Sequence, residues 1–137
     1  MESSDHPLFS LFHIGLSIQN LNKKSEKKLG LSLVQWCLLK HLIDMPAVPA
    51  HFLAKTVGVH PSTLTQTLKR LERRKYIYIA EDPKDSRKKL ISLTRLGNNA
   101  LENANAPMIN WSINFSDLKA ELQHLRSFLK NQVNQEL

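Results

Sequence analysis

The sequence has little cysteine, glycine or tryptophan: one cysteine (Cys37), four glycines and two tryptophans among 137 residues. A single cysteine cannot close an internal disulfide, which excludes a disulfide-held secreted scaffold and favours a reducing compartment. No run of apolar residues approaches the roughly 18 that are needed to cross a bilayer. Residues 1–7 have neither the basic start nor the apolar core of a secretory signal. These absences predict a cytoplasmic protein without a membrane partner.

The sequence also lacks the motifs of catalysis. It has no nucleophile motif, no glycine-rich phosphate loop and no paired carboxylates. Cys37 and His41 have the i, i+4 spacing of two metal ligands, and only His13 or Glu26 could complete such a site. A buried cysteine beside a hydrogen-bonded histidine is the simpler interpretation, and no nearby cation would stabilise a Cys37 thiolate for redox sensing. We therefore predict no enzyme, no metal and no cofactor.

Charge, in contrast, is abundant and unevenly distributed. Nineteen lysines and arginines against twelve acidic residues give a formal net charge of +7. Residues 69–89 hold nine basic and four acidic residues, and a second basic cluster lies at residues 23–28. Such concentrated charge favours a polyanion, either nucleic acid or an anionic membrane surface. A basic surface that serves only solubility is the alternative that charge alone leaves open.

The composition, 42% apolar and 23% charged, fits one globular domain over residues 1–137. Apolar residues three and four positions apart predict amphipathic helices, of which the second, capped by Ser32, is apolar nearly all round and therefore central. We expect the first four helices at residues 7–28, 32–45, 51–57 and 61–74.

The periodicity then changes to the two-residue alternation of strands. We expect a strand, a polar loop and a second strand at residues 76–80, 81–87 and 89–93. Thr94 then caps a fifth helix that Pro107 interrupts, and Ser116 with Asp117 caps a sixth.

The first and last helices carry apolar stripes that are too wide for one small domain to cover. The stripes consist of Leu8, Leu11, Phe12, Ile18 and Leu21 in the first helix and of Leu118, Leu122, Leu125 and Leu129 in the last. The two termini could pack on each other, or they could clasp the same helices of a second copy. The width of the stripes favours the second arrangement, so we predict a homodimer.

Residues 50–71 fit a helix-turn-helix. This motif needs a small residue where its helices cross, which is Ala54, and a residue that tolerates positive φ four positions later, which is Gly58. The outward face of the motif's own second helix, expected at residues 61–74, has no acidic residue between Ser62 and Leu71. That face carries Ser62, Thr63, Thr65, Gln66, Lys69, Arg70 and Arg73.

These outward residues have the chemistry of a helix in the major groove of DNA. Amides and hydroxyls read base edges there, while lysine and arginine neutralise phosphates. A plain solvated face would explain the charges but not the missing acids and the matching turn. We therefore predict that these seven residues bind double-stranded DNA.

The predicted hairpin provides a second contact. Its tip holds Asp85, Arg87 and Lys88, and an arginine on a protruding arm can enter a narrow minor groove. Asp85 could orient the Arg87 guanidinium for this purpose. Alternatively, Arg87 could simply pair with Asp85 and Asp82 on the surface, a weak interaction. We favour the DNA contact and include Arg87 and Lys88 in the predicted interface.

The predicted helix-turn-helix and hairpin resemble those of a known family. The run from Asp85 to Thr94 is similar to the wing signature of the MarR (multiple-antibiotic-resistance regulator) family, Asp-x-Arg followed six residues later by Leu-Thr. Residues 63–72 resemble that family's recognition helix, and Leu93-Thr94 with Gly97 resembles the start of the helix after the wing. The family often has a glycine before the first strand, and this chain departs from it by having Lys75-Tyr76-Ile77 there.

The resemblance implies a mainly α (α+β) fold: a winged helix-turn-helix with N- and C-terminal dimerisation helices. The DNA-binding lobe would span residues 32–93, between dimerisation helices at residues 7–29 and 94–137. Thr65 and Gln66 would lie in the major groove and Arg87 in the minor groove, with Asp85 orienting Arg87.

The resemblance also implies a homodimeric repressor that binds a pseudo-palindromic operator and is released by a small effector. An aromatic or phenolic effector would bind near His13 and Trp36, although a tryptophan is more often simply part of the core. The alternative function is a winged-helix module for protein interaction or dimerisation, whose basic face meets an acidic partner without sequence-specific DNA binding.

Overall fold

The computed structural model describes the backbone of residues 6–113 and 116–136 and the side chains of residues 6–111 and 119–133. Within these residues the chain forms six helices and three strands. In chain order they are α1 (Pro7–Leu29), α2 (Leu33–His41), β1 (Val48–Pro49), α3 (Ala50–Val57), α4 (Pro61–Arg73), β2 (Ile77–Asp82), β3 (Asp85–Leu93), α5 (Arg95–Ile113) and α6 (Ser116–Glu136).

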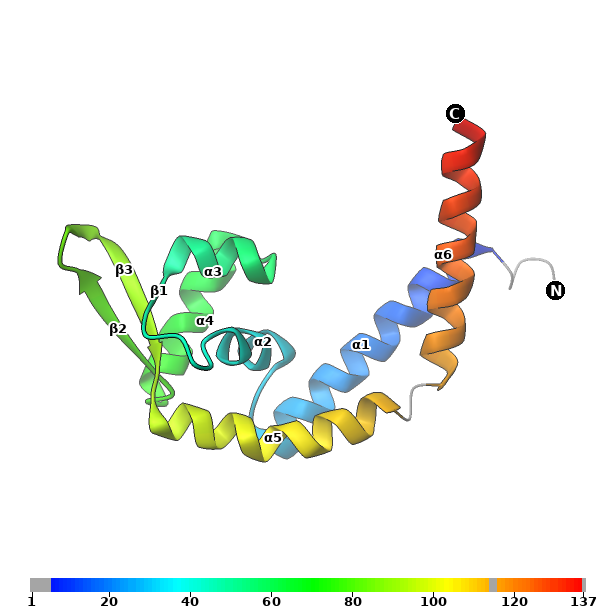
Figure 1. The fold of residues 1–137 in the computed structure, drawn as a ribbon. Helices are drawn as coiled ribbons and strands as arrows, with labels where there is room; N and C mark the ends of the chain where they lie inside the picture. The colour runs from blue at the N-terminus through cyan, green and yellow to red at the C-terminus, as the bar shows by residue number, and fades with distance from the viewer. Residues whose placement is uncertain (1–5, 114–115, 137) are drawn as a thin grey trace.

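The molecule has two regions (Figure 1). Helices α2, α3 and α4 pack with the small sheet into what we call the winged lobe. Helices α1 and α6 lie against each other and form what we call the arm, while α5 runs along the base from the lobe toward the arm. This arrangement is a mainly helical winged helix, and it confirms the predicted fold class.

Helices α1, α2 and α4 begin at residues that satisfy their free N–H groups. Ser32 accepts from the Gln35 N–H over 3.1 Å, and the Gln35 side chain accepts from the Ser32 N–H, which completes a capping box. Helices α1 and α4 both start with His-Pro: His6 and His60 each accept, through Nδ1, the N–H two residues later over 3.2 Å. The sequence analysis predicted the serine cap but not the two histidine caps.

Helix α2 ends at His41, four residues before the predicted end at residue 45. The chain turns at Leu42, whose N–H contacts the Leu39 and Lys40 carbonyls, and Asp44 then takes a left-handed φ of 60°. The residue that precedes a proline disfavours the helical conformation. The helix therefore ends before Pro46, although the apolar pattern that predicted it continues.

The sheet has three strands in the order β1-β3-β2, rather than the predicted two. Strand β1 is only two residues long, and Val48 pairs with Ile91 of β3. A two-residue strand has no periodicity to detect, and Pro49, which lacks an N–H, fits an edge strand.

The hairpin is also longer than predicted. Strands β2 and β3 extend through the expected polar loop and leave Pro83 and Lys84 as the connection. Charged side chains do not prevent pairing here, because the strands are joined through their backbones. The expected loop at residues 81–87 was therefore wrong, and Arg87 lies inside β3.

Lys75, in the turn between α4 and β2, adopts a left-handed φ of 62°. Its N–H donates to the Glu72 carbonyl over 2.9 Å. Thr94 then closes the turn, because its hydroxyl donates to the Lys75 carbonyl over 2.6 Å and accepts from the Gly97 N–H over 3.0 Å. A Cβ on Gly97 would lie 2.1 Å from the Tyr76 carbonyl oxygen, so only glycine fits there.

Helix α5 continues through Pro107, where we expected an interruption. Proline removes one backbone donor from a helix, yet Met108 and Ala104 on the same helix are buried and hold this segment in place. Helix α6 begins at Ser116 as predicted, but the side chains of Ser116, Asp117 and Leu118 lie outside the described residues, and so does their predicted role.

The core lies where α2, α4, β3 and α5 meet, and α2 is central as predicted. The fully buried side chains of the core include Leu38, Leu39, Leu42, Leu53, Leu71, Ile91 and Leu101. Among the described helices, none combines the length and the apolar character needed to cross a bilayer.

Candidate nucleic-acid interface

The turn between α3 and α4 has the geometry that the sequence predicts. Gly58 ends α3 with φ 79° and ψ 31°, and its N–H donates to the Ala54 carbonyl over 2.9 Å. The Val59 N–H donates to the same carbonyl over 3.1 Å. Ala54 is buried at the crossing with α4, as a small residue must be. These bonds fix the direction in which α4 leaves the turn.

Helix α4 divides cleanly into two faces. Leu64, Leu68 and Leu71 are buried against the core. All seven predicted interface residues of α4 are exposed: Ser62, Thr63, Thr65, Gln66, Lys69, Arg70 and Arg73. The first turn holds no acidic residue, and Arg70 and Arg73 lie in the last turn. The exposed face thus changes from hydroxyl and amide groups to cations along the helix.

Several α4 hydroxyls are held by the helix itself. Thr65 Oγ1 donates to the Pro61 carbonyl over 2.9 Å, which fixes the orientation of its methyl group and leaves its oxygen lone pairs available. Ser62 Oγ lies 2.8 Å from His60 Nδ1 at the start of the helix. Because Ser62 N–H donates to the same Nδ1, the ring proton of neutral His60 is on Nε2, which can then donate to an acceptor outside the chain.

The hairpin of β2 and β3, which we call the wing, presents one arginine in a defined orientation. Arg87 N and Nε donate to Asp85 Oδ1 over 3.1 and 3.2 Å. The Arg87 side chain nevertheless keeps 90% of its accessible surface. Its hydrogen bonds lower the pKa of the Asp85 carboxyl below the ordinary value. Asp85 therefore holds Arg87 without covering it, and no pairing with Asp82 accompanies this contact.

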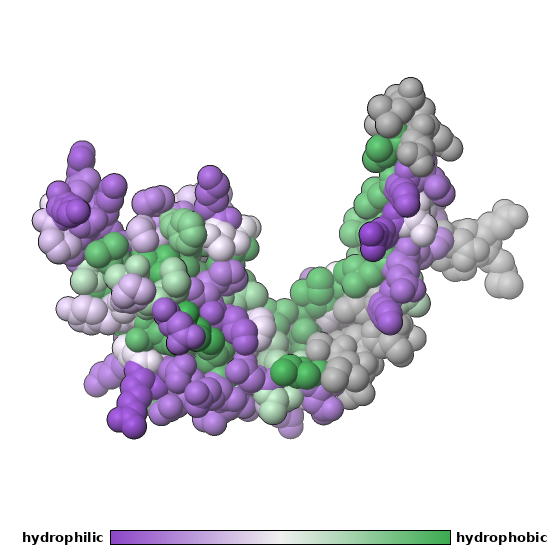
Figure 2. All heavy atoms as spheres, in the orientation of Figure 1, coloured by the Kyte–Doolittle hydropathy of each residue, from purple (hydrophilic) through white to green (hydrophobic). Residues whose placement is uncertain are grey.

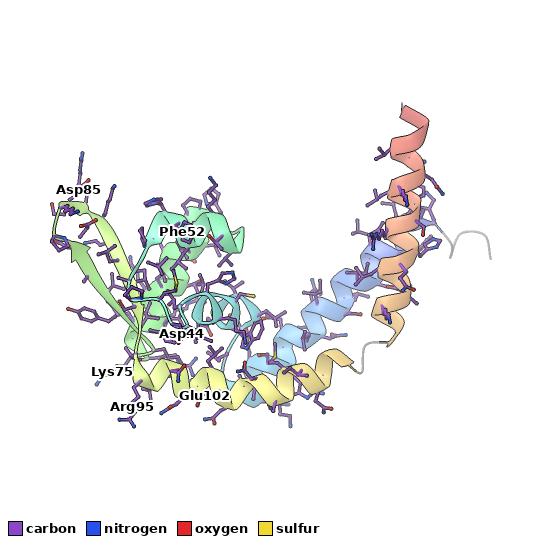
Figure 3. All side chains as sticks on the ribbon, in the orientation of Figure 1. Asp44, Phe52, Lys75, Asp85, Arg95 and Glu102 are labelled. Atoms are coloured by element: carbon purple, nitrogen blue, oxygen red, sulfur yellow. The ribbon has the colours of Figure 1, made fainter. Side chains whose placement is uncertain are left out.

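Asp85 lies at the tip of the hairpin, well away from the body of the lobe (Figure 3). Lys88 is exposed near this tip, whereas Lys89 pairs across the strands with Glu81 over 3.3 Å. The Lys84 N–H donates to Asp82 Oδ1 over 2.9 Å and shapes the two-residue connection. The wing is thus a two-stranded ribbon with exposed cations near its end.

The two predicted effector residues lie in different places. Trp36 borders a cavity of about 290 Å³, which is lined by Leu21, Leu33, Trp36, Cys37, Met108 and Ile109. Trp36 Nε1 is buried and has no hydrogen-bond partner among the described residues. His13 lies farther along α1, where its Nδ1 is 2.9 Å from Glu121 Oε1 of α6. Within the single chain, the cavity includes Trp36 but not His13.

The possible metal ligands do not form a site in the part of the chain that the structure describes. His41 Nδ1 lies 2.7 Å from the backbone oxygen of Cys37, not from its thiol. Burial raises the pKa of the Cys37 thiol, which disfavours the thiolate that a metal or an oxidant requires. No three histidine, cysteine, aspartate or glutamate side chains converge among the described residues.

Two residues outside the predicted set become notable in the structure. His60 caps α4, and a histidine before a proline at the start of a helix was the available signal. Arg74 follows α4 and bonds to Gly30, which is 44 positions away. No local pattern could reveal that contact.

Comparison with known proteins places this geometry in context. A sequence model described as the MarR family matches residues 29–88. No curated protein matches the chain. Among solved structures, a MepR-like protein complexed with pseudoligands is 30% identical, covers 87% of this chain and 86% of its own, and superposes with a TM-score of 0.66.

Two further structures share the fold at lower identity. A MarR family transcriptional regulator from Streptomyces coelicolor, in complex with DNA, has 22% identity and a TM-score of 0.76, over 95% of this chain and 84% of its own. The PcaV transcriptional regulator from the same organism, in complex with its natural ligand, has 24% identity and a TM-score of 0.62, over 77% and 75% of the two chains.

Proposed function

Because the chain belongs to the MarR family of transcriptional regulators, we propose that it is a homodimeric repressor that binds a pseudo-palindromic DNA operator and is released by a small effector. Membership in this family confirms the expectation of a regulator and not an enzyme. Helix α4 of each chain enters a major groove, and each wing reaches the adjacent minor groove. The lobe of residues 32–93 binds the DNA, and residues 7–29 and 94–137 join the two chains in the cytoplasm.

The observation that carries this proposal is the pairing of two surfaces on one lobe. The exposed face of α4 combines Thr65 and Gln66 with a basic end, and the wing presents Arg87 held by Asp85. Bases are read by amides and hydroxyls in the major groove, while an arginine suits the negative potential of a narrow minor groove. The similar regulator from Streptomyces coelicolor was solved in complex with DNA.

The arm supports a dimer. Figure 2 shows the molecule hollowed between the winged lobe and the arm, with apolar side chains along the side of the arm that faces the hollow. Although α1 and α6 pack on each other, they leave many large apolar side chains exposed. These are Leu8, Phe9, Leu11, Phe12, Leu16, Ile18, Leu122, Leu129 and Val133. A contiguous apolar surface of this kind is typical of an interface, and a second copy offers the matching face.

The cavity beside Trp36 supports an effector site. Its volume of about 290 Å³ suits one small aromatic molecule, and its lining is apolar. The buried Trp36 Nε1, which has no partner within the part of the chain that the structure describes, would donate to the effector's polar group. The MepR-like protein and PcaV were both solved with ligands. An effector wedged between α2 and α5 would change how the lobe sits on the arm.

DNA selection tests the proposal. The protein is mixed with random duplexes, the retained duplexes are sequenced, and binding is measured against salt concentration. We expect a two-fold symmetric consensus and a salt slope that reflects several phosphates. Gln66→Ala should relax one base position in each half-site, whereas Arg87→Ala should weaken all duplexes and lower the slope by about one. If no duplex is retained but an acidic protein binds, the protein-interaction alternative holds.

A further inference from the structure

Arg74 follows the last residue of α4, and its exposed side chain is hydrogen-bonded to two other parts of the protein. Its Nη1 donates to the Gly30 carbonyl, and its Nη2 donates to the Tyr76 hydroxyl over 3.0 Å. The guanidinium carbon also lies 4.5 Å from the centre of the Tyr76 ring, within the range of a cation–π contact. This use of both ends of a planar fork is specific to arginine, because a lysine has one compact ammonium group.

The Gly30 carbonyl belongs to the corner between α1 and α2, and this corner is fixed to α1. Ser25 is fully buried and donates through Oγ to the Leu31 carbonyl over 2.5 Å. The Leu33 N–H donates to Asn22 Oδ1 over 2.8 Å. The group that the guanidinium holds is therefore part of a rigid joint at the end of the arm.

The other contact of Arg74 lies where the wing begins. The Tyr76 N–H donates to the Leu71 carbonyl over 3.0 Å, and the Tyr76 carbonyl accepts from the Thr94 N–H, at the start of α5, over 3.1 Å. The guanidinium thus links the α1–α2 corner to Tyr76 at the base of the wing. The Tyr76 backbone is bonded in turn to the end of α4 and to the start of α5.

Arg74 also lies far from the tip of the lobe. Figure 3 shows Lys75, the next residue, at the end of the lobe opposite to Asp85 of the wing tip and Phe52 of α3. A cation at that end, with both terminal nitrogens bonded to protein, is poorly placed to bind a DNA phosphate. Arg95, which is exposed at the start of α5 and lies near Lys75 in Figure 3, makes a matched control.

We propose that Arg74 is a positioning residue for DNA recognition: it fixes α4 and the wing to the corner of α1 and does not itself bind DNA. The inference rests on the proposed function. Base reading requires both α4 helices to fit their grooves at once, whereas binding to random duplex depends mainly on the number of cations. Loss of the Arg74 fork therefore weakens operator binding selectively.

The deciding variant is Arg74→Lys, which keeps the charge and loses the fork. Affinities for the selected operator and for a random duplex of the same length are measured by fluorescence anisotropy over a range of salt concentrations. Circular dichroism confirms that each variant is folded at the assay temperature. We expect Arg74→Lys to lower operator affinity about tenfold, as the loss of a charged hydrogen bond implies, without changing random-duplex affinity or the salt slope.

Two other variants sharpen the result. Tyr76→Phe removes one acceptor of the fork and should lower operator affinity in the same selective way by a smaller factor. Arg95→Lys should leave operator affinity near the wild-type value, because Arg95 is an exposed arginine of α5 outside the proposed DNA interface. Wild-type operator affinity in Arg74→Lys, together with a slope lowered by about one in Arg74→Ala, would make Arg74 a phosphate contact and overturn the proposal. Failure of the wild-type protein to bind any duplex would instead overturn the proposed function.

Discussion

The winged lobe and the arm of this molecule differ in how far their large apolar side chains are buried within one chain. The lobe buries a core within one chain, in which Leu38, Leu39 and Leu71 have no exposed surface. Its exposed large apolar residues are scattered: Met45, Phe52 and Tyr78. The arm leaves Phe12 60% exposed and Leu129 54% exposed, although α1 and α6 already pack together. The core of the lobe is therefore complete in one copy, whereas the arm leaves apolar surface that the proposed second chain would cover. Substitutions in the two regions should consequently differ in how their effects depend on protein concentration.

The largest effect is expected in the lobe. Leu71→Ala removes a fully buried side chain and should lower the free energy of unfolding by about 2–5 kcal/mol. Leu122→Ala, at a half-exposed site on the arm, is the matched control. Urea unfolding at two chain concentrations separates them, because the loss in Leu71→Ala should be the same at both. Equal losses in the two variants would contradict a lobe that is complete by itself.

The next effect concerns the arm. Phe12→Glu places a charge in the exposed apolar stripe of α1 and should convert the dimer to monomers. Operator affinity should then fall by about a hundredfold, because the two half-sites are no longer bound together. Light scattering after gel filtration gives the mass. Tyr78→Glu, on an equally exposed aromatic residue of the wing, should stay dimeric; a dimeric Phe12→Glu would show that the stripe is not the interface.

A smaller effect is expected at the turn between α4 and β2. Lys75 has a φ of 62°, which costs a residue with a Cβ about 1 kcal/mol. Lys75→Gly should therefore raise the free energy of unfolding by up to about 1 kcal/mol, equally at every chain concentration. Lys88→Gly, within β3, should lower it. If Lys75→Gly is also destabilising, the lysine side chain contributes a contact that outweighs its backbone strain.

The smallest effect concerns Asp85. Its folded-state pKa is lowered by the Arg87 hydrogen bonds, so the stabilisation is present above its unfolded pKa and is lost as the pH falls through the folded value. NMR titration of the Asp85 carboxyl carbon should show an apparent pKa below about 3.9, the ordinary value for aspartate. Arg87→Ala should return that pKa upward. An unchanged titration in Arg87→Ala would mean that the pair does not persist in solution.

Much of the lobe was predictable because its signals are local. Gly58 ends α3 and Leu64, Leu68 and Leu71 face the core, as the turn chemistry and periodicity of the sequence predict. The predicted α4 residues lie together on an exposed face, but their contacts with DNA stay a prediction. Strand β1 and the contact between Arg74 and Gly30 were not predictable, because both depend on partners more than 40 residues away.

Two expectations about secondary structure, at Pro107 and in the hairpin, were wrong. Pro107 was expected to interrupt α5, but burial of neighbouring side chains keeps the helix continuous. Residues 81–87 of the hairpin were expected to be a loop, but backbone pairing extends both strands to Asp82 and Asp85. In both cases packing or pairing outweighs the local preference of the residue.

Hydroxyl-radical footprinting of the selected operator, combined with the mass of the complex, tests the account most directly. Two lobes on one arm-to-arm dimer should protect two half-sites whose centres lie about one helical turn, or a multiple of it, apart. The complex should contain two chains for each duplex, with added minor-groove protection where each wing lies. One asymmetric protected patch with one chain per duplex would contradict it.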